Sequence, residues 1–201
     1  MKRRLIPLAA CGLLIAAAAP GPRDPDWPCQ QIKVPHLSWA AVWSGPAPDE
    51  QHGDWRDDSQ LADLVQSMAQ RRVPVDQMQA QIRAFAAQAG DQKAPKLLLA
   101  LSAVFGLLDD ERSSVIDGLD RFGGRQKELA AALRQDTEKL RAMQADSSAD
   151  AGEVDQIEQR VTWEGRVFQD RRQALSYACD VPAKIEQRLF AIARAVQEVL
   201  E

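Results

Sequence analysis

The chain has 201 residues, 27% of them charged, and a net charge of −4. This length fits a single domain, and the acidic balance disfavours nucleic acid as a partner, because phosphate backbones are bound by clustered Lys and Arg. The sequence contains no period-two runs of β-branched residues, so its composition predicts an all-α protein.

Residues 1–19 are predicted to be an export signal. A basic start, Met1 to Arg4, precedes a largely apolar stretch from Leu5 to Ile15, and the small residues 16–19 offer a cleavage site. The apolar stretch is shorter than the roughly 20 residues that a transmembrane helix requires, so we expect no membrane span after cleavage. The alternatives are an uncleaved anchor and a lipoprotein acylated on Cys11. The predicted location is periplasmic or secreted.

Cleavage would change both the charge and the cysteine count. It removes three of the 25 basic residues, which leaves 22 against 29 acidic residues and a net charge of −7. It also removes Cys11, so that Cys29 and Cys179 remain. In an oxidising compartment these two cysteines predict a structural disulfide. Two separate buried thiols and a redox-active pair are the alternatives, although the chain has no Cys-x-x-Cys motif.

Residues 20–58 are rich in proline and hold four of the five tryptophans. Prolines keep a segment extended, whereas Ser38 is expected to cap a short helical turn that places Trp39 and Trp43 on one face. We interpret the segment as an irregular strap that lies on the helices and is tied down by Cys29. The alternative is an exposed docking site in which Trp39 and Trp43 contact a partner or a sugar.

The acidic stretch 49–58 contains His52, with Asp49 and Asp54 close to it in the sequence. Carboxylate oxygens and an imidazole nitrogen would suit a divalent metal ion, although the spacing matches no known metal motif. A solvated acidic turn is the competing interpretation, and we expect no cofactor.

Motifs for catalysis are missing from the sequence. There is no Gly-x-Ser-x-Gly, and no serine is placed plausibly with a histidine and an aspartate. We therefore predict that the protein is not an enzyme.

Two short amphipathic helices are predicted next, from the cap candidates Asp57 to Ser59 as far as about Gln70, and from about Val75 to Ala89. Gly90 should end the second. A long helix is then expected to begin near Ala94.

Two long heptad repeats predict the main feature of the fold. The first runs from Leu101 to Met143 and the second from Val154 to Val199, with a polar loop at 144–152 between them. They predict an antiparallel coiled-coil hairpin with that loop at its tip. The expected register gives facing residues numbers that add up to 297, as in Phe122 with Leu175. Pro182 is expected to bend the second helix.

Two irregularities interrupt the apolar seam between the long helices. Gln126 and Arg171 are expected to face each other as a polar layer that sets the register. Gly123 and Gly124 lower helix propensity without a break in the heptads, which indicates a weak spot or a close contact.

The predicted organisation is a helical bundle over residues 59–201, from which a thinner stalk projects beyond about Arg112. The two short helices should pack at its base, where residues 97–108 are apolar on more than one face. These patterns favour an exported, non-enzymatic interaction, scaffold or adaptor protein of the bacterial cell envelope, with a protein partner or a second copy of itself as a homodimer. The alternative is a periplasmic accessory protein that binds a metal or a small molecule through segment 49–58 and the tryptophans.

Overall fold

A computed structural model describes residues 24–45 and 53–201 of the protein. Within these ranges the fold is all-α and has no strands, as predicted. The predicted signal at 1–19 and the alternative acylation site Cys11 lie outside the described residues. In chain order the elements are α1 (Trp39–Val42), η1 (Trp55–Asp57), α2 (Ser59–Ala69), α3 (Val75–Gln88), η2 (Gly90–Gln92), α4 (Lys93–Ala145), α5 (Ala151–Cys179) and α6 (Val181–Leu200).

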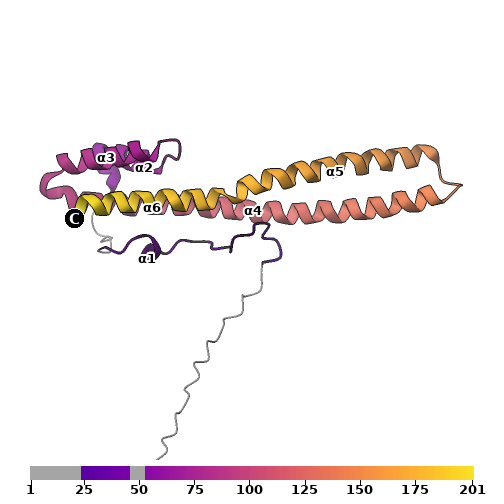
Figure 1. The fold of residues 1–201 in the computed structure, drawn as a ribbon, viewed down its shortest axis with the longest axis horizontal. Coiled ribbons are helices and arrows are strands. Elements are labelled where there is room, and N and C mark those ends of the chain that lie inside the picture. The colour runs from indigo at the N-terminus through magenta and orange to yellow at the C-terminus, as the bar shows by residue number, and fades with distance from the viewer. Residues whose placement is uncertain (1–23, 46–52) are drawn as a thin grey trace, which may run out of the picture.

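The fold is dominated by a long helical hairpin, which confirms that prediction (Figure 1). Helix α4 has 53 residues and runs antiparallel to α5 and α6, which follow one another along its length. A helix of that length spans about 80 Å. The turn at the tip is shorter than predicted: it covers residues 146–150, and Asp150 accepts a hydrogen bond from the Glu153 N–H to begin α5.

The returning arm of the hairpin is interrupted at Asp180, where α5 ends and α6 begins. We expected one helix with a bend at Pro182. Pro182 instead occupies the first turn of α6, where backbone N–H groups have no partner within the helix, so a proline costs no hydrogen bond. In a continuous helix its ring would meet the carbonyl of Ala178, and the chain avoids this by starting a new helix.

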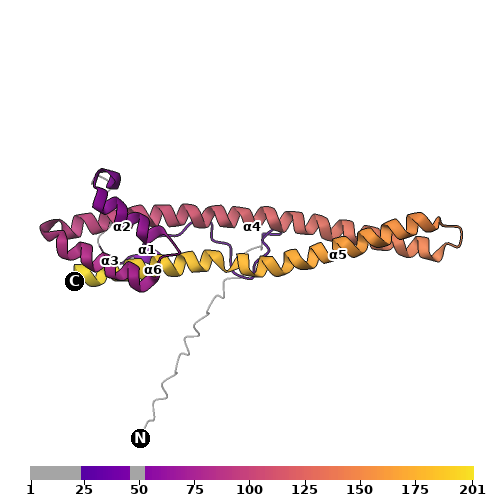
Figure 2. The same cartoon turned by 90° about the horizontal axis from the view of Figure 1, so that it is seen from above.

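Helices α2 and α3 lie on one side of the α4–α6 pair (Figures 1 and 2). Asp58 caps α2 by accepting hydrogen bonds from the backbone N–H groups of Gln60 and Leu61, as its position before the apolar residues predicted. Helix α3 ends before Gly90, which takes the positive φ of 52° that ends many helices.

The hydrophobic core is concentrated in what we call the base, which comprises α2, α3, α6 and residues 93–112 of α4. Its fully buried side chains include Met68, Ile82, Leu101 and Leu189. We call the remainder of the hairpin, residues 113–145 and α5, the stalk. Between residues 127 and 181, all of them described, only Ile157 is buried.

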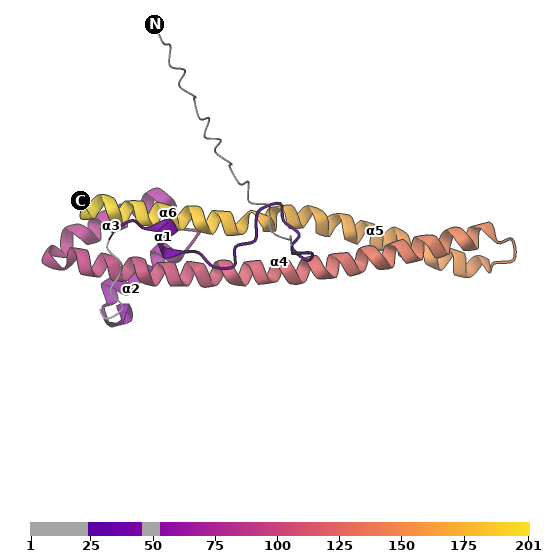
Figure 3. The ribbon, with the colours of Figure 1, turned by 90° about the horizontal axis from the view of Figure 1, so that it is seen from below.

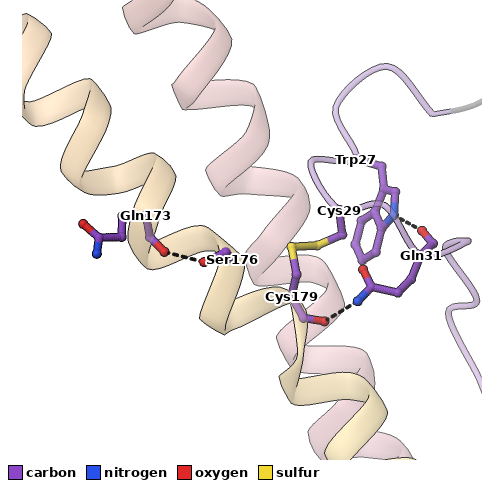
Figure 4. The surroundings of a disulfide bond; sticks show 6 residues. All are labelled: Trp27, Cys29, Gln31, Gln173, Ser176 and Cys179. Carbon is purple, nitrogen blue, oxygen red and sulfur yellow. Dashed lines mark hydrogen bonds between the residues drawn. A yellow bond between two sulfur atoms is a disulfide. The ribbon is translucent and has the colours of Figure 1, made fainter.

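Residues 24–45 run along the other side of the hairpin, away from α2 and α3 (Figure 3). A disulfide joins Cys29 to Cys179 at the end of α5, with the two Cα atoms 5.6 Å apart, and this confirms the predicted pairing (Figure 4). The bond closes a sequence separation of 150 residues. Closing a loop of this length stabilises the fold by up to about 5 kcal/mol, because the cross-link lowers the entropy of the unfolded chain.

In the part of the chain that the structure describes, no helix combines the length and the apolar character needed to cross a membrane.

Candidate functional site

The hairpin has two long edges where α4 meets its returning arm, and only one of them is covered by residues 24–45. Arg112 of α4 makes the central contact with residues 24–45 on the covered edge, and this contact leaves only 3% of the residue exposed. Its Nη1 donates to the carbonyl oxygen of Val34 at 2.5 Å, and its Nε donates to Glu186 of α6 at 2.7 Å. One guanidinium therefore ties the N-terminal segment, α4 and α6 together.

Asp109 lies one turn before Arg112 and accepts hydrogen bonds from the same segment. Its Oδ1 accepts from the Leu37 N–H at 2.7 Å, and its Oδ2 lies 2.9 Å from His36 Nδ1. Ser113 Oγ is 3.1 Å from that same Nδ1 and donates to the carbonyl oxygen of Pro35 at 2.8 Å. No sequence pattern predicted this Ser–His–Asp cluster. In a catalytic triad the serine and the aspartate bind different ring nitrogens, whereas here both lie at Nδ1, so the cluster holds the segment in place.

Two lysines continue the contact towards the tip. Lys33 binds Asp24 at 2.7 Å and also Asp120 of α4, and these two hydrogen bonds, that of Asp120 first, raise the pKa of Lys33 to about 12. Lys127 of α4 binds Asp26 at 2.8 Å. Opposite charges therefore line the segment and α4 along this edge.

Gly123 allows the segment to approach α4 closely. A Cβ atom added at this position would overlap the carbonyl oxygen of Asp26 and would lie 3.2 Å from Cδ of Pro28. A Cβ atom added at Gly124 would meet nothing within 4 Å. Of the two interpretations of this glycine pair, the close contact is therefore correct for Gly123.

The disulfide lies at the centre of the covered edge. Trp27 Nε1 donates to the carbonyl oxygen of Gln31 at 2.6 Å, and the Gln31 amide reaches the carbonyl oxygen of Cys179 at 3.4 Å (Figure 4). Beside it a cavity of about 220 Å³ is lined by the segment, α4 and α6. Trp27 and Pro182 are among its lining residues.

The two tryptophans considered for docking are packed against the helices. Trp43 is 5% exposed and belongs to the core. Trp39 is partly buried and meets the ring of Phe105 edge to face, with the ring centroids 5.0 Å apart. This pair is therefore packed into the fold and does not stand out as an exposed aromatic surface.

Gln126 and Arg171, the predicted polar layer, do not form a side-chain pair. Gln126 is 9% exposed and donates to the backbone carbonyl of Phe168 at 3.1 Å. Arg171 is exposed. Its long side chain can reach water from a thin stalk, so the buried amide bonds to the backbone of α5 instead.

The proposed metal ligands are only partly described. Asp49 and His52 lie outside the described residues. Asp54 accepts hydrogen bonds from the backbone N–H and the guanidinium of Arg56, and the former lowers the pKa of Asp54 most. Among the residues that the structure describes, no three His, Cys, Asp or Glu side chains gather as metal ligands would.

The opposite edge of the hairpin carries an apolar groove of about 220 Å³, which sequence reasoning did not identify. Phe122 and Leu175, which the predicted register places opposite each other, both line it. The remaining lining residues are Val115, Gly118, Leu119, Ala174 and Ala178. The heptads contained a signal for it: Gly118 and Ala174 are small residues beside the seam, where longer side chains usually cover the apolar contact.

Comparison with protein-family models, with curated proteins and with solved structures gave no match to this chain.

Proposed function

We propose that the protein is an exported, non-enzymatic adaptor or scaffold of the cell envelope, and that its stalk is a coiled coil that contacts a protein partner. The observation that carries this proposal is the low burial of the stalk. Residues 113–145 alone extend about 50 Å, yet only Ile157 is buried between residues 127 and 181. A long hairpin with so few buried residues is suited to contacting a partner at a distance from the base, because its surface remains available for binding.

The disulfide and the N-terminal segment support the same proposal. A disulfide that joins distant parts of a chain persists in oxidising compartments, as export would require. Residues 24–45 then act as a strap that stiffens the hairpin where α5 gives way to α6. Contacts of the strap reach from Trp39 on Phe105 to Asp26 on Lys127. A stiff stalk presents its outer half in a fixed direction, and this reduces the entropy lost on binding.

Site-specific photo-crosslinking in living cells tests the proposal. A photoreactive amino acid is placed at Ser147 in the tip, at Trp163 on the stalk, or at Gln187 in the base as the matched control; all three are exposed. We expect one defined protein to be captured from Ser147 or Trp163 and not from Gln187. Capture of the chain itself identifies a homodimer. Capture from the base alone, or from none of the three positions, contradicts the proposal.

A further inference from the structure

The open edge of the hairpin continues a surface that α2 and α3 cover in the base. Four residues at a spacing of seven mark this line on α4: Leu97, Val104, Glu111 and Gly118. Leu97 and Val104 have no exposed surface and share the core with side chains of α2 and α3. Glu111 binds Arg71, in the turn between α2 and α3, at 2.8 Å. Gly118 is the next position, and there the covering helices have ended and the groove begins.

The groove has the apolar floor and the open mouth that an amphipathic helix needs. Its lining is almost entirely apolar, with Phe122 and Leu175 as the largest side chains. A Cβ atom added at Gly118 would meet only Arg121 Nη2, at 4.0 Å, so the mouth of the groove is open beside a guanidinium. Helices α2 and α3 show that amphipathic helices pack on this side of the hairpin.

The rim of the groove is more basic than the chain as a whole. Arg121, Arg125 and Arg171 are exposed and lie within one helical turn of residues that line the groove. Arg172 is exposed there as well, and the exposed acidic side chains within one turn of the groove residues on the same two helices are Asp117 on α4 and Asp170 on α5. In a protein with 29 acidic residues against 25 basic ones, this local excess of arginine indicates acidic flanks on the occupant.

An exposed aromatic ring extends the apolar surface beside the groove. Tyr177 is 68% exposed and lies three residues after Ala174, on the same edge of α5. Tyrosine rings that stand beside an apolar pocket are typical of binding surfaces, because the ring buries its face while its hydroxyl group stays hydrated.

We propose that this groove binds an amphipathic helix of a partner protein, with the apolar stripe of the helix on Phe122 and Leu175 and acidic side chains beside Arg121 and Arg125. This inference rests on the proposed interaction function and specifies the surface and the chemistry of the partner. The occupant extends the layer of α2 and α3 along the stalk.

Binding of designed peptides to the full, disulfide-bonded chain tests the proposal. Two fluorescent peptides of about 20 residues carry the same leucine stripe at i, i+3, i+4 and i+7, one flanked by Glu and the other by Lys. We expect saturable binding of the Glu-flanked peptide, about tenfold tighter than that of the Lys-flanked peptide, and weaker binding as the salt concentration rises.

Two matched variants locate the binding. Gly118→Leu fills the groove, whereas Gly124→Leu places the same side chain on α4 where an added Cβ meets nothing. We expect about tenfold weaker binding for Gly118→Leu and an unchanged affinity for Gly124→Leu. The double variant Arg121→Glu/Arg125→Glu should reverse the preference and favour the Lys-flanked peptide, and the helical circular dichroism of each variant shows whether it folds.

Several outcomes overturn the inference. Equal affinity for both peptides would contradict the proposal that the partner is acidic. An equal loss of affinity in the two leucine variants would show that the groove is not the binding site. Self-association that Gly118→Leu abolishes, measured by sedimentation, assigns the groove to a second copy of the chain. If neither peptide binds while crosslinks still form from Ser147 or Trp163, the groove assignment fails and the interaction function stands.

Discussion

The base and the stalk share the helix α4, yet they hold their shape in different ways. In the base, α4 contacts α2, α3 and α6, and its side chains are buried from several directions. In the stalk it runs beside α5 and, at the start of the stalk, the first turn of α6, with residues 24–45 along one edge as far as Lys127. Beyond that point the leucines of α4 are half-buried. One heptad pattern therefore supports either a core or a seam, depending on how many neighbouring elements cover its flanks.

The largest expected effect comes from removing the same side chain in each region. Leu189 in the base has no exposed surface, whereas Leu140 near the tip is half-buried. We expect Leu189→Ala to lower the free energy of unfolding by about 3 kcal/mol or more, because it leaves a cavity. Leu140→Ala should lower it by about 1 kcal/mol, since water already reaches the site.

Urea unfolding followed by circular dichroism measures both variants, and hydrogen exchange shows where each opens. Backbone amides near Leu140 should exchange faster than those near Leu189 even in the unmodified protein. Equal losses of stability in the two variants would mean that the stalk is packed as tightly as the base.

Substitutions at the adjacent glycines Gly123 and Gly124 distinguish the strap contact from the effect of helix propensity. Gly123→Ala should lower the free energy of unfolding by about 1–3 kcal/mol, because the added methyl group would overlap the carbonyl oxygen of Asp26. Gly124→Ala should raise it by up to about 1 kcal/mol, because alanine favours the helix and the position is open.

The same urea unfolding experiment measures this pair, and trypsin sensitivity of the strap at Lys33 reports whether it has lifted. Stabilisation by both alanines would show that the strap does not rest on Gly123.

Much of the fold could be predicted from local signals. Asp58 and Gly90 mark helix ends by their own chemistry, and the heptads predict the hairpin because their period reflects how helices pair. The role of Arg188 could not be predicted. It looks like a surface residue in the sequence, yet it is 5% exposed and donates to backbone carbonyls of Ser67, Met68 and Val73. Burial lowers the pKa of Arg188, and the carbonyl partners at the end of α2 compensate for its lost hydration.

The candidate site was harder to predict than the fold, because it depends on an irregular segment. Which edge of the hairpin the strap covers is decided by single contacts, such as Asp109 with the Leu37 N–H, that have no sequence period. The open groove exists only because the strap lies on the other edge. The sequence nevertheless contained the small residues that shape it, Gly118 and Ala174.

The smallest expected effect is on the pH dependence of stability, and it should differ between the base and the tip. The hydrogen bond from Lys96, and then that from the Leu61 N–H, lower the pKa of Asp58 from its ordinary 3.8. The Ser148 hydroxyl and N–H lower the pKa of Asp146 at the tip in the same way. A carboxylate with a lowered pKa adds stability that is present above pH 3.8 and is lost as the pH falls through that value towards the folded pKa. For Asp58 the amount is below about 1 kcal/mol, because the ion pair is partly solvated.

Asp58→Asn keeps an acceptor for the backbone N–H groups of α2 and removes the charge. Its free energy of unfolding should therefore fall less between pH 6 and pH 3 than that of the unmodified protein. Asp146→Asn should leave this pH dependence of global unfolding unchanged, since the tip can open without the base. Chemical denaturation at each pH measures the slopes. If Asp146→Asn flattens the slope as much as Asp58→Asn does, the tip and the base unfold as one unit, and the contrast between them is lost.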